Sequence, residues 1–284
     1  MNQLPDFMPA LITPFGQRGE IDIRAHTSNM RVLAERGIQG YVIGGSNGEG
    51  PYLEPGERAR LVKAGRRRKA HFMVGVGAQS TRLTLSQVSE ATEAGADSLL
   101  VLTPTTLARG RDEAVLRFYR TVADRSNVPI FLYSVPPVTA YSLPLDLISR
   151  LSRHENIVGM KDSSGDVVRL QSIIDATPRD FLLYSGSSRA LTAAMAVGCH
   201  GAITGSGNYA PQLVLETLKA AKSDPTSARR LQKRLSALSA SVEAHGIPGV
   251  KAAAKAAGLE PGYPREPLTR ASRGVETSIA KLII

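Results

Sequence analysis

The chain has 284 residues, 42% of them hydrophobic, and a formal net charge of +10. This is enough apolar material for one large core, and no apolar run approaches the roughly 20 residues of a membrane helix. Cys199 is the single cysteine, which excludes an intrachain disulfide. The start of the chain lacks the basic and apolar stretches of a signal peptide. These features predict a cytoplasmic protein with no membrane partner.

The positive charge raises the question of a nucleic-acid partner. The densest basic run, residues 66–69, lies at the end of a predicted helix, where cations complement the helix dipole. Tryptophan is absent and aromatic residues make up 5% of the chain, with no base-stacking pattern among the charges. We therefore expect no nucleic-acid binding, and a mild attraction for small carboxylates instead.

Short apolar runs alternate with amphipathic stretches along the chain, with a period of about 25 residues. The first predicted helix, 22–36, stops at Gly37, and a later one, 82–94, stops at Gly95. The apolar runs have the length and composition of parallel strands buried on both faces. The predicted strands are residues 8–13, 41–44, 72–76, 98–102, 130–133, 157–161, 181–184 and 201–204.

Eight strand–helix units end near Ala221, and they favour a closed (β/α)8 TIM barrel. An open doubly wound sheet is the rival, but the G-x-G-x-x-G fingerprint is missing after the first strand. Beyond residue 223 the period breaks down, and three helices are predicted at 229–244, 250–258 and 270–282. We expect a barrel over 1–222 and a C-terminal helical extension over 223–284, packed together as one functional domain.

The barrel prediction directs attention to polar residues that end apolar strands, because active sites of such barrels lie there. Lys161 ends the strand 157–161. Partial desolvation at the barrel mouth favours the neutral amine, which can attack a carbonyl. A solvent-exposed lysine at a strand end is the competing interpretation. Tyr133 ends the preceding strand and could exchange protons with Lys161, or simply pack at the barrel rim.

A glycine-rich turn, residues 44–50, follows the second predicted strand. Its glycines permit backbone conformations closed to other residues, so that successive N–H groups can cradle an anion such as a substrate carboxylate. Ser46 adds a hydroxyl that could link proton movements to Tyr133. The turn lacks the G-K-[ST] ending of a nucleotide-binding P-loop.

Metal and serine-nucleophile chemistry are not indicated. The five histidines show no ligand spacing, and a lone cysteine offers no cluster, so we expect no metal. The stretch 185–188 is rich in serine but lacks the G-x-S-x-G elbow. We interpret it as a strand end and helix N-cap that lines the pocket, with Gly186 among the substrate-binding residues.

Three motifs in this order resemble the dihydrodipicolinate synthase / N-acetylneuraminate lyase family over nearly the whole chain. They are Gly45–Glu49, Tyr133–Pro136 and Val158–Ser163. The resemblance implies a barrel with appended helices, commonly a tetramer, that uses no cofactor beyond a covalent imine on a lysine. It assigns the imine with pyruvate to Lys161 and the proton shuttle to Tyr133.

The remaining roles follow from the same resemblance. It places the substrate carboxylate on the turn at Gly45, Ser46 and Asn47. It places Ile203 beside pyruvate. Ser163, the last residue of its motif, is expected to contact substrate. The implied partners are a small 2-oxo acid and further copies of the chain, as a tetramer or dimer.

Within the family the closest resemblance is to 4-hydroxy-2-oxoglutarate aldolase, so we expect cleavage of such a 2-oxo acid to pyruvate and an aldehyde. Val138 stands where lysine-pathway synthases have an arginine for the second substrate's carboxylate. Thr105 and Thr106 replace a tyrosine pair of those synthases, and the missing tyrosine counts somewhat against the aldolase as well. Condensation of pyruvate with an aldehyde, as in dihydrodipicolinate synthase, remains the alternative. A non-catalytic barrel that binds sugar acids or 2-oxo acids remains another.

Overall fold

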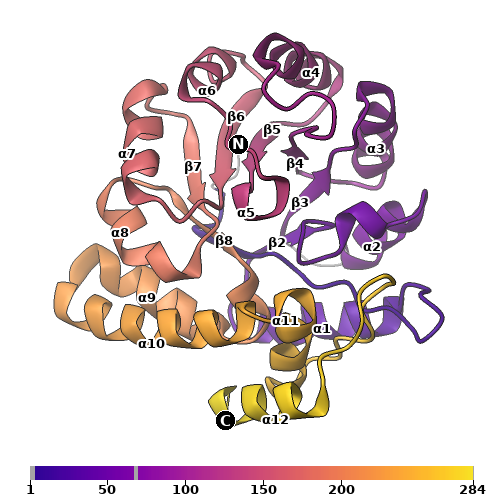
Figure 1. The fold of residues 1–284 in the computed structure, drawn as a ribbon, viewed down its shortest axis with the longest axis vertical. Coiled ribbons are helices and arrows are strands. Elements are labelled where there is room, and N and C mark those ends of the chain that lie inside the picture. The colour runs from indigo at the N-terminus through magenta and orange to yellow at the C-terminus, as the bar shows by residue number, and fades with distance from the viewer. Residues whose placement is uncertain (1–3, 67–69, 284) are drawn as a thin grey trace.

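A computed structural model describes residues 4–66 and 70–283. Within these residues, eight parallel strands form one sheet in the order β1-β8-β7-β6-β5-β4-β3-β2, with helices outside it (Figure 1). The predicted (β/α)8 barrel is confirmed. The strands are β1 Phe7–Pro9, β2 Gly40–Ile43, β3 His71–Val76, β4 Ser98–Leu102, β5 Ile130–Ser134, β6 Ile157–Asp162, β7 Leu182–Ser185 and β8 Gly201–Thr204.

The barrel closes between β1 and β2. Ala10 forms a parallel bridge with Val42, and the Leu11 amide donates to the Val42 carbonyl at 2.9 Å. We predicted a first strand through residue 13, which is too long at its C-terminal end. The Ile12 amide donates to the side chain of Asn208 at 3.0 Å instead of to a neighbouring strand, so the ladder ends there.

Local signals explain where the helices begin and end. The Asp22 side chain accepts from the Ala25 amide and caps α1, and Gly37 follows that helix with a φ of 84°. Ser80 caps α3 in the same way, and Gly95 follows it with a φ of 99°. The helices of the barrel are α1 Ile23–Glu35, α2 Glu57–Gly65, α3 Thr81–Glu93, α4 Asp112–Arg125, α5 Pro136–Thr139, α6 Leu145–Leu151, α7 Val167–Ala176, α8 Leu191–Ala196 and α9 Pro211–Ser223.

The apolar side chains form two layers, as the alternation of a barrel strand requires. The outer layer lies between strands and helices and includes Phe72 and Met160. The inner layer fills the barrel and includes Tyr133 near one end. The buried members of the inner layer are Leu4, Met8, Ala10, Val42, Met73, Leu100, Phe131, Tyr133, Val135, Tyr184 and Ile203.

Three helices follow α9: α10 Pro225–Glu243, α11 Gly246–Ala256 and α12 Arg273–Ile283. In Figure 1 they occupy one side of the barrel, where α10 runs along α9 and α12 packs against α11. The segment between α11 and α12 also contacts the N-terminal part of the chain, because Tyr263 pairs with Phe15 in an antiparallel bridge. The predicted extension helices are thus found, a few residues displaced. The domain division at residues 222 and 223 stays a prediction.

Two predictions concern membranes and the basic run. No helix in the described ranges 4–66 and 70–283 has the length and apolarity to cross a membrane. The run at 66–69 follows α2, as predicted, but residues 67–69 lie outside the described residues. Its Arg66 side chain forms an ion pair with Asp97 at 2.7 Å.

Candidate active site

The two residues predicted to carry the chemistry lie side by side at the C-terminal ends of neighbouring strands. Tyr133 on β5 and Lys161 on β6 are direct partners in the strand register. The Lys161 Nζ lies 3.5 Å from the Tyr133 Oη and 4.5 Å from the centre of its ring. Both side chains are buried, each residue being 4% exposed. The amine is therefore held in a desolvated place with a hydroxyl beside it.

A local irregularity of β6 places Lys161 inside the barrel. The register shifts between β5 and β6, so that Phe131 pairs with Gly159 rather than with Val158. A Cβ at Gly159 would lie 2.3 Å from the Leu182 carbonyl oxygen on β7 and 2.4 Å from the Phe131 ring, so both neighbours require glycine here. Two residues further along the same strand face, Lys161 points inward above Phe131. No carboxylate of residues 4–66 and 70–283 forms an ion pair with it.

Ser46 connects the glycine-rich turn to this pair. Its hydroxyl lies 3.1 Å from the Tyr133 Oη, so Ser46, Tyr133 and Lys161 form a continuous hydrogen-bonding row. The turn can approach because its glycines allow close backbone contact. A Cβ at Gly50 would lie 1.9 Å from the Gly44 carbonyl oxygen, and one at Gly75 on β3 would lie 2.4 Å from it.

The turn also offers backbone donors. In the described part of the chain, the N–H groups of Ser46 and Asn47 donate no hydrogen bond. The Asn47 side chain lies against Gly205, which directly follows β8, since a Cβ at Gly205 would be 3.0 Å from the Asn47 Nδ2. These donors suit a carboxylate, as an anion-binding nest does.

The other predicted site residues lie at the same end of the barrel. Ser163 follows β6 and touches Gly186 after β7, where a Cβ would lie 2.0 Å from the Ser163 Oγ. Ile203 on β8 is fully buried in the inner layer. Gly45 and Ser46 line, with Tyr133, a small cavity of about 20 Å³ that extends toward β3 and β4. The predicted helix N-cap at 185–188 is wrong in one respect, because Ser187 makes no side-chain capping bond.

Three residues that depart from the synthase pattern form no hydrogen bond with Ser46, Tyr133 or Lys161 in the described structure. Val138 lies on α5 with 67% of its surface exposed. Thr105 and Thr106 follow β4, and their amides donate to the Gln79 side chain at 3.1 and 2.8 Å. Neither threonine supplies a phenol to the site.

Sequence reasoning missed residues that hold the row in place. The Thr103 hydroxyl lies 2.7 Å from the Tyr119 Oη and 3.4 Å from the Tyr133 carbonyl oxygen. Burial raises the pKa of Tyr119 well above its usual value, so its hydroxyl keeps its proton. Asp162, next to Lys161, forms an ion pair with Arg169 at 2.9 Å and accepts from the Ser164 amide. The sequence signal was present in Asp162, which stands inside a recognised motif.

The described side chains form no cluster that could hold a metal ion, because no group of three or more histidine, cysteine, aspartate or glutamate residues gathers among them. The donors at the barrel mouth are instead an amine, two hydroxyls and backbone N–H groups. This set suits an electrophilic carbonyl with a carboxylate beside it.

Comparison with known proteins places this arrangement in a family. The model of the dihydrodipicolinate synthetase family matches residues 3–284. The chain belongs to this family. It is 32% identical over 276 residues to 4-hydroxy-tetrahydrodipicolinate synthase of Laribacter hongkongensis, covering 95% of this chain and 94% of that protein. The family resemblance expected from the three motifs is therefore confirmed.

Solved structures of the dihydrodipicolinate synthetase family show the same architecture. A dihydrodipicolinate synthase from Bacillus anthracis matches with a TM-score of 0.94 and 27% identity, over 100% of this chain and 98% of that one. A chloride-inhibited synthase from Acinetobacter baumannii, complexed with pyruvate, matches with a TM-score of 0.92 and 28% identity, over 99% and 100% of the two chains. The chain is a carbon–carbon lyase of this family.

Within the dihydrodipicolinate synthetase family, the comparisons change the balance between the expected reactions. Relatives carry the name of the synthase, which the sequence analysis had placed second, behind 4-hydroxy-2-oxoglutarate aldolase. The names favour condensation of pyruvate over the aldolase reaction.

Proposed function

We propose that this protein is a class I enzyme that forms an imine between Lys161 and pyruvate and joins the bound pyruvate to an aldehyde. The observation that carries the proposal is the row of Lys161, Tyr133 and Ser46 at the barrel mouth, with separations of 3.5 and 3.1 Å. An amine that is 4% exposed and forms no ion pair with a carboxylate of the described residues is suited to nucleophilic attack. The family and the pyruvate complex of a 28% identical synthase support the same substrate.

In this mechanism the pyruvate carboxylate is held by the backbone N–H groups of Ser46 and Asn47. The Lys161 Nζ attacks the ketone carbon to give a carbinolamine. Tyr133 gives a proton to the departing hydroxyl, so that water leaves and a protonated imine remains. Ser46 hydrogen-bonds the Tyr133 Oη and links it to further proton exchange.

The protonated imine then acts as an electron sink. The Tyr133 oxygen takes a proton from the methyl carbon, which gives an enamine. This carbon attacks the aldehyde carbon to form the new bond, and Tyr133 gives the proton to the aldehyde oxygen. Hydrolysis of the imine frees Lys161. Because each step is reversible, the same residues would also cleave a 4-hydroxy-2-oxo acid to pyruvate and an aldehyde.

Cleavage of 4-hydroxy-2-oxoglutarate is the second candidate reaction. It is favoured by Val138, which is 67% exposed and offers no charge to the carboxylate of a synthase acceptor. Loss of a charged hydrogen-bond donor costs roughly 1.5–3 kcal/mol. Thr106, at the place of a synthase tyrosine, points the same way. Both features concern the second substrate and leave imine formation untouched.

Turnover assays in both directions separate the two reactions. Pyruvate consumption is measured with a panel of aldehydes, including the acceptor of 4-hydroxy-tetrahydrodipicolinate synthases, and pyruvate release is measured with 4-hydroxy-2-oxo acids. We expect the higher kcat/KM in the condensation direction, with Lys161→Ala inactive in both. Efficient release of pyruvate from 4-hydroxy-2-oxo acids, with no consumption of pyruvate in the presence of aldehydes, would identify the protein as the aldolase instead. Pyruvate binding without turnover in either direction would indicate a non-catalytic barrel.

Cytoplasmic location and assembly as a tetramer or dimer are part of this proposal as well. They rest on the single cysteine and on the family resemblance. Size measurement in solution tests the assembly directly.

A further inference from the structure

The sixth residue of the glycine-rich turn, Glu49, has an unusual environment. Glu49 adopts a left-handed backbone conformation, with φ 54° and ψ 35°, which is unfavourable for a residue with a side chain. Its carboxylate is completely buried, although a buried carboxylate without partners is costly. A conformation of this kind persists where surrounding contacts enforce it.

Those contacts come from the C-terminal extension. The Lys251 Nζ, on α11, lies 2.7 Å from the Glu49 Oε1, and both side chains are at most 4% exposed. The backbone N–H of Arg265 donates to the Glu49 Oε2 at 2.8 Å. Both oxygens of the carboxylate are thus held by residues more than 200 positions away in the chain.

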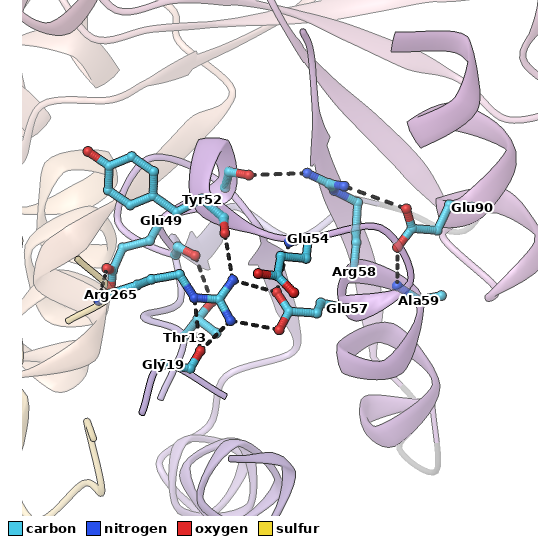
Figure 2. Close-up of polar contacts among 12 residues, drawn as sticks. Thr13, Gly19, Glu49, Tyr52, Glu54, Glu57, Arg58, Ala59, Glu90 and Arg265 are labelled. Carbon is cyan, nitrogen blue, oxygen red and sulfur yellow. Dashed lines mark hydrogen bonds and ion pairs between the residues drawn. The ribbon is translucent and has the colours of Figure 1, made fainter. Parts of the chain in front are cut away.

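The two cations are themselves fixed. Lys251 donates to the carbonyl oxygens of Thr13 at 2.9 Å and Tyr263 at 2.5 Å. The Arg265 guanidinium forms a two-pronged ion pair with Glu57, at 2.6 and 2.7 Å (Figure 2). It also donates to the carbonyl oxygens of Gly19 and Tyr52.

The residues on either side of Glu49 are fixed from within the barrel. Arg58 on α2 donates to the Gly75 carbonyl at 2.9 Å and to the Gly50 carbonyl at 3.3 Å, and its guanidinium faces Glu90 (Figure 2). The Thr13 hydroxyl donates to the Gly48 carbonyl at 2.7 Å. Along the chain, these fixed points directly follow Ser46 and Asn47, whose N–H groups donate no hydrogen bond in the described structure.

We propose that Lys251 and Arg265 are positioning residues, which act through Glu49 to hold the turn in the conformation that binds the substrate carboxylate. The inference rests on the proposed function, since it assigns the carboxylate of the 2-oxo acid to this turn. It makes the C-terminal extension part of the active site, although none of its residues in this network touches the row of Ser46, Tyr133 and Lys161.

If the only role of the Glu49–Lys251 contact were to attach the extension to the barrel, a buried ion pair would not be required. Well-packed apolar residues replace buried ion pairs with equal or better stability, so such a pair is weak support for a stabilising role. The extension is also joined to the barrel by Arg24 and Glu260, an exposed ion pair at 2.8 Å that does not contact the turn. Arg24 therefore offers a matched control for Lys251.

Titration of Lys251 gives the network a pH dependence. Burial lowers the pKa of Lys251 to about 8, although Glu49 raises it. The charged groups that face Lys251 are Glu49 from the turn and Arg265 from the segment after α11. Above about pH 8 the ammonium loses its charge, Glu49 loses its ion-pair partner, and the hold on the turn weakens.

The test compares Lys251→Met with Arg24→Ala in the full-length protein. The pyruvate dependence of borohydride trapping on Lys161 gives an apparent KM for pyruvate that does not involve the aldehyde. Hydrogen exchange of a peptide that covers residues 44–53 reports on the turn itself, with no need for catalysis. We expect Lys251→Met to raise the KM roughly 10-fold and to speed exchange in that peptide. Arg24→Ala should change neither.

Two further variants separate positioning from stability. The pair Lys251→Met with Glu49→Gln removes the unpaired buried charge, so the melting temperature should recover while the KM stays high. Lys251→Arg keeps a cation and should restore the KM. From pH 7 to 9.5 the KM of the wild type should rise, whereas that of Lys251→Met should already be high and flat.

The outcomes distinguish the two proposals. Wild-type protein that forms no adduct on Lys161 would end the proposed function, and the exchange rate of the turn would still report on the network. An adduct with unchanged KM and unchanged exchange in Lys251→Met would overturn the positioning role. If Lys251→Met alone does not fold, the pair Lys251→Met with Glu49→Gln, which leaves no unpaired buried charge, takes its place. Wild-type KM and exchange in that pair would then overturn the proposal.

Discussion

The two halves of the candidate site are held in place by different means. Tyr133 and Lys161 lie opposite each other on adjacent strands, so the register of β5 and β6 alone sets their separation. The turn with Ser46 and Asn47 depends on Glu49, whose carboxylate is held by Lys251 and Arg265 of the extension. The reactive pair is thus a property of the barrel, whereas the carboxylate turn is a property of the whole chain.

This difference predicts which kinetic constant, kcat or KM, a substitution in each half should change. In the proposed mechanism Tyr133 and Lys161 act on the reacting atoms, so changes at these two residues should lower kcat. The same proposal assigns the substrate carboxylate to the turn, so changes in the ion network should raise KM first. The predictions that follow test this division, beginning with the largest effect.

Lys161→Ala removes the nucleophile. The imine route is lost, and we expect kcat to fall by about 10³-fold or more. Steady-state turnover and intact mass after trapping provide the measurement. Activity near that of the wild type would exclude Lys161 as the nucleophile.

Tyr133→Phe keeps the ring beside Lys161 and removes the hydroxyl that lies 3.5 Å from its Nζ. General acid–base catalysis contributes about 10²–10⁴-fold, so we expect kcat to fall by roughly 10²-fold with a smaller change in KM. Pre-steady-state trapping should show slower imine formation. If kcat/KM of Tyr133→Phe falls while imine formation keeps the wild-type rate, Tyr133 acts in a later step.

Gly159→Ala places a methyl group 2.4 Å from the Phe131 ring, beneath Lys161. Overpacking of this kind costs about 1–3 kcal/mol of unfolding free energy. Urea denaturation measures that cost, and we expect a fall in kcat because Lys161 is displaced. Val158→Ala, one residue earlier, is the control, and it should leave kcat within about two-fold because it adds no atoms. A stable Gly159→Ala with normal kcat would show that the inner layer tolerates displacement.

Thr13→Val has the smallest expected effect. It removes the hydroxyl that donates to the Gly48 carbonyl at 2.7 Å and keeps the shape of the side chain. A neutral hydrogen bond contributes about 0.5–1.5 kcal/mol, so the KM for pyruvate should rise by a few-fold while kcat is retained. A fall in kcat of Thr13→Val with unchanged KM would contradict the expectation that changes at the turn act on KM.

Sequence reasoning reached the fold and the reactive pair because both rest on local patterns. The apolar runs and the glycine stops at Gly37 and Gly95 predict the barrel, and a barrel requires Tyr133 and Lys161 to share one end. The register shift that pairs Phe131 with Gly159 has no comparable signal. The predicted end of β1 was also wrong. The strand ends because the Ile12 amide donates to Asn208, which lies 196 residues away in the chain.

The ion network lay beyond sequence reasoning for a similar reason. Glu49 stands inside a recognised motif, but its partners come from α11 and from the segment after it. Arg265 and Glu49 are 216 residues apart, and no pattern in either stretch points to the other. Lys251 reads as one polar position of an amphipathic helix, although it is 3% exposed.

The most direct test of the account is borohydride reduction of the wild-type protein with pyruvate, followed by intact mass and peptide mapping. The account predicts one reduced pyruvyl adduct per chain, located on Lys161. Absence of an adduct, or an adduct on another lysine while Lys161 stays unmodified, would contradict it.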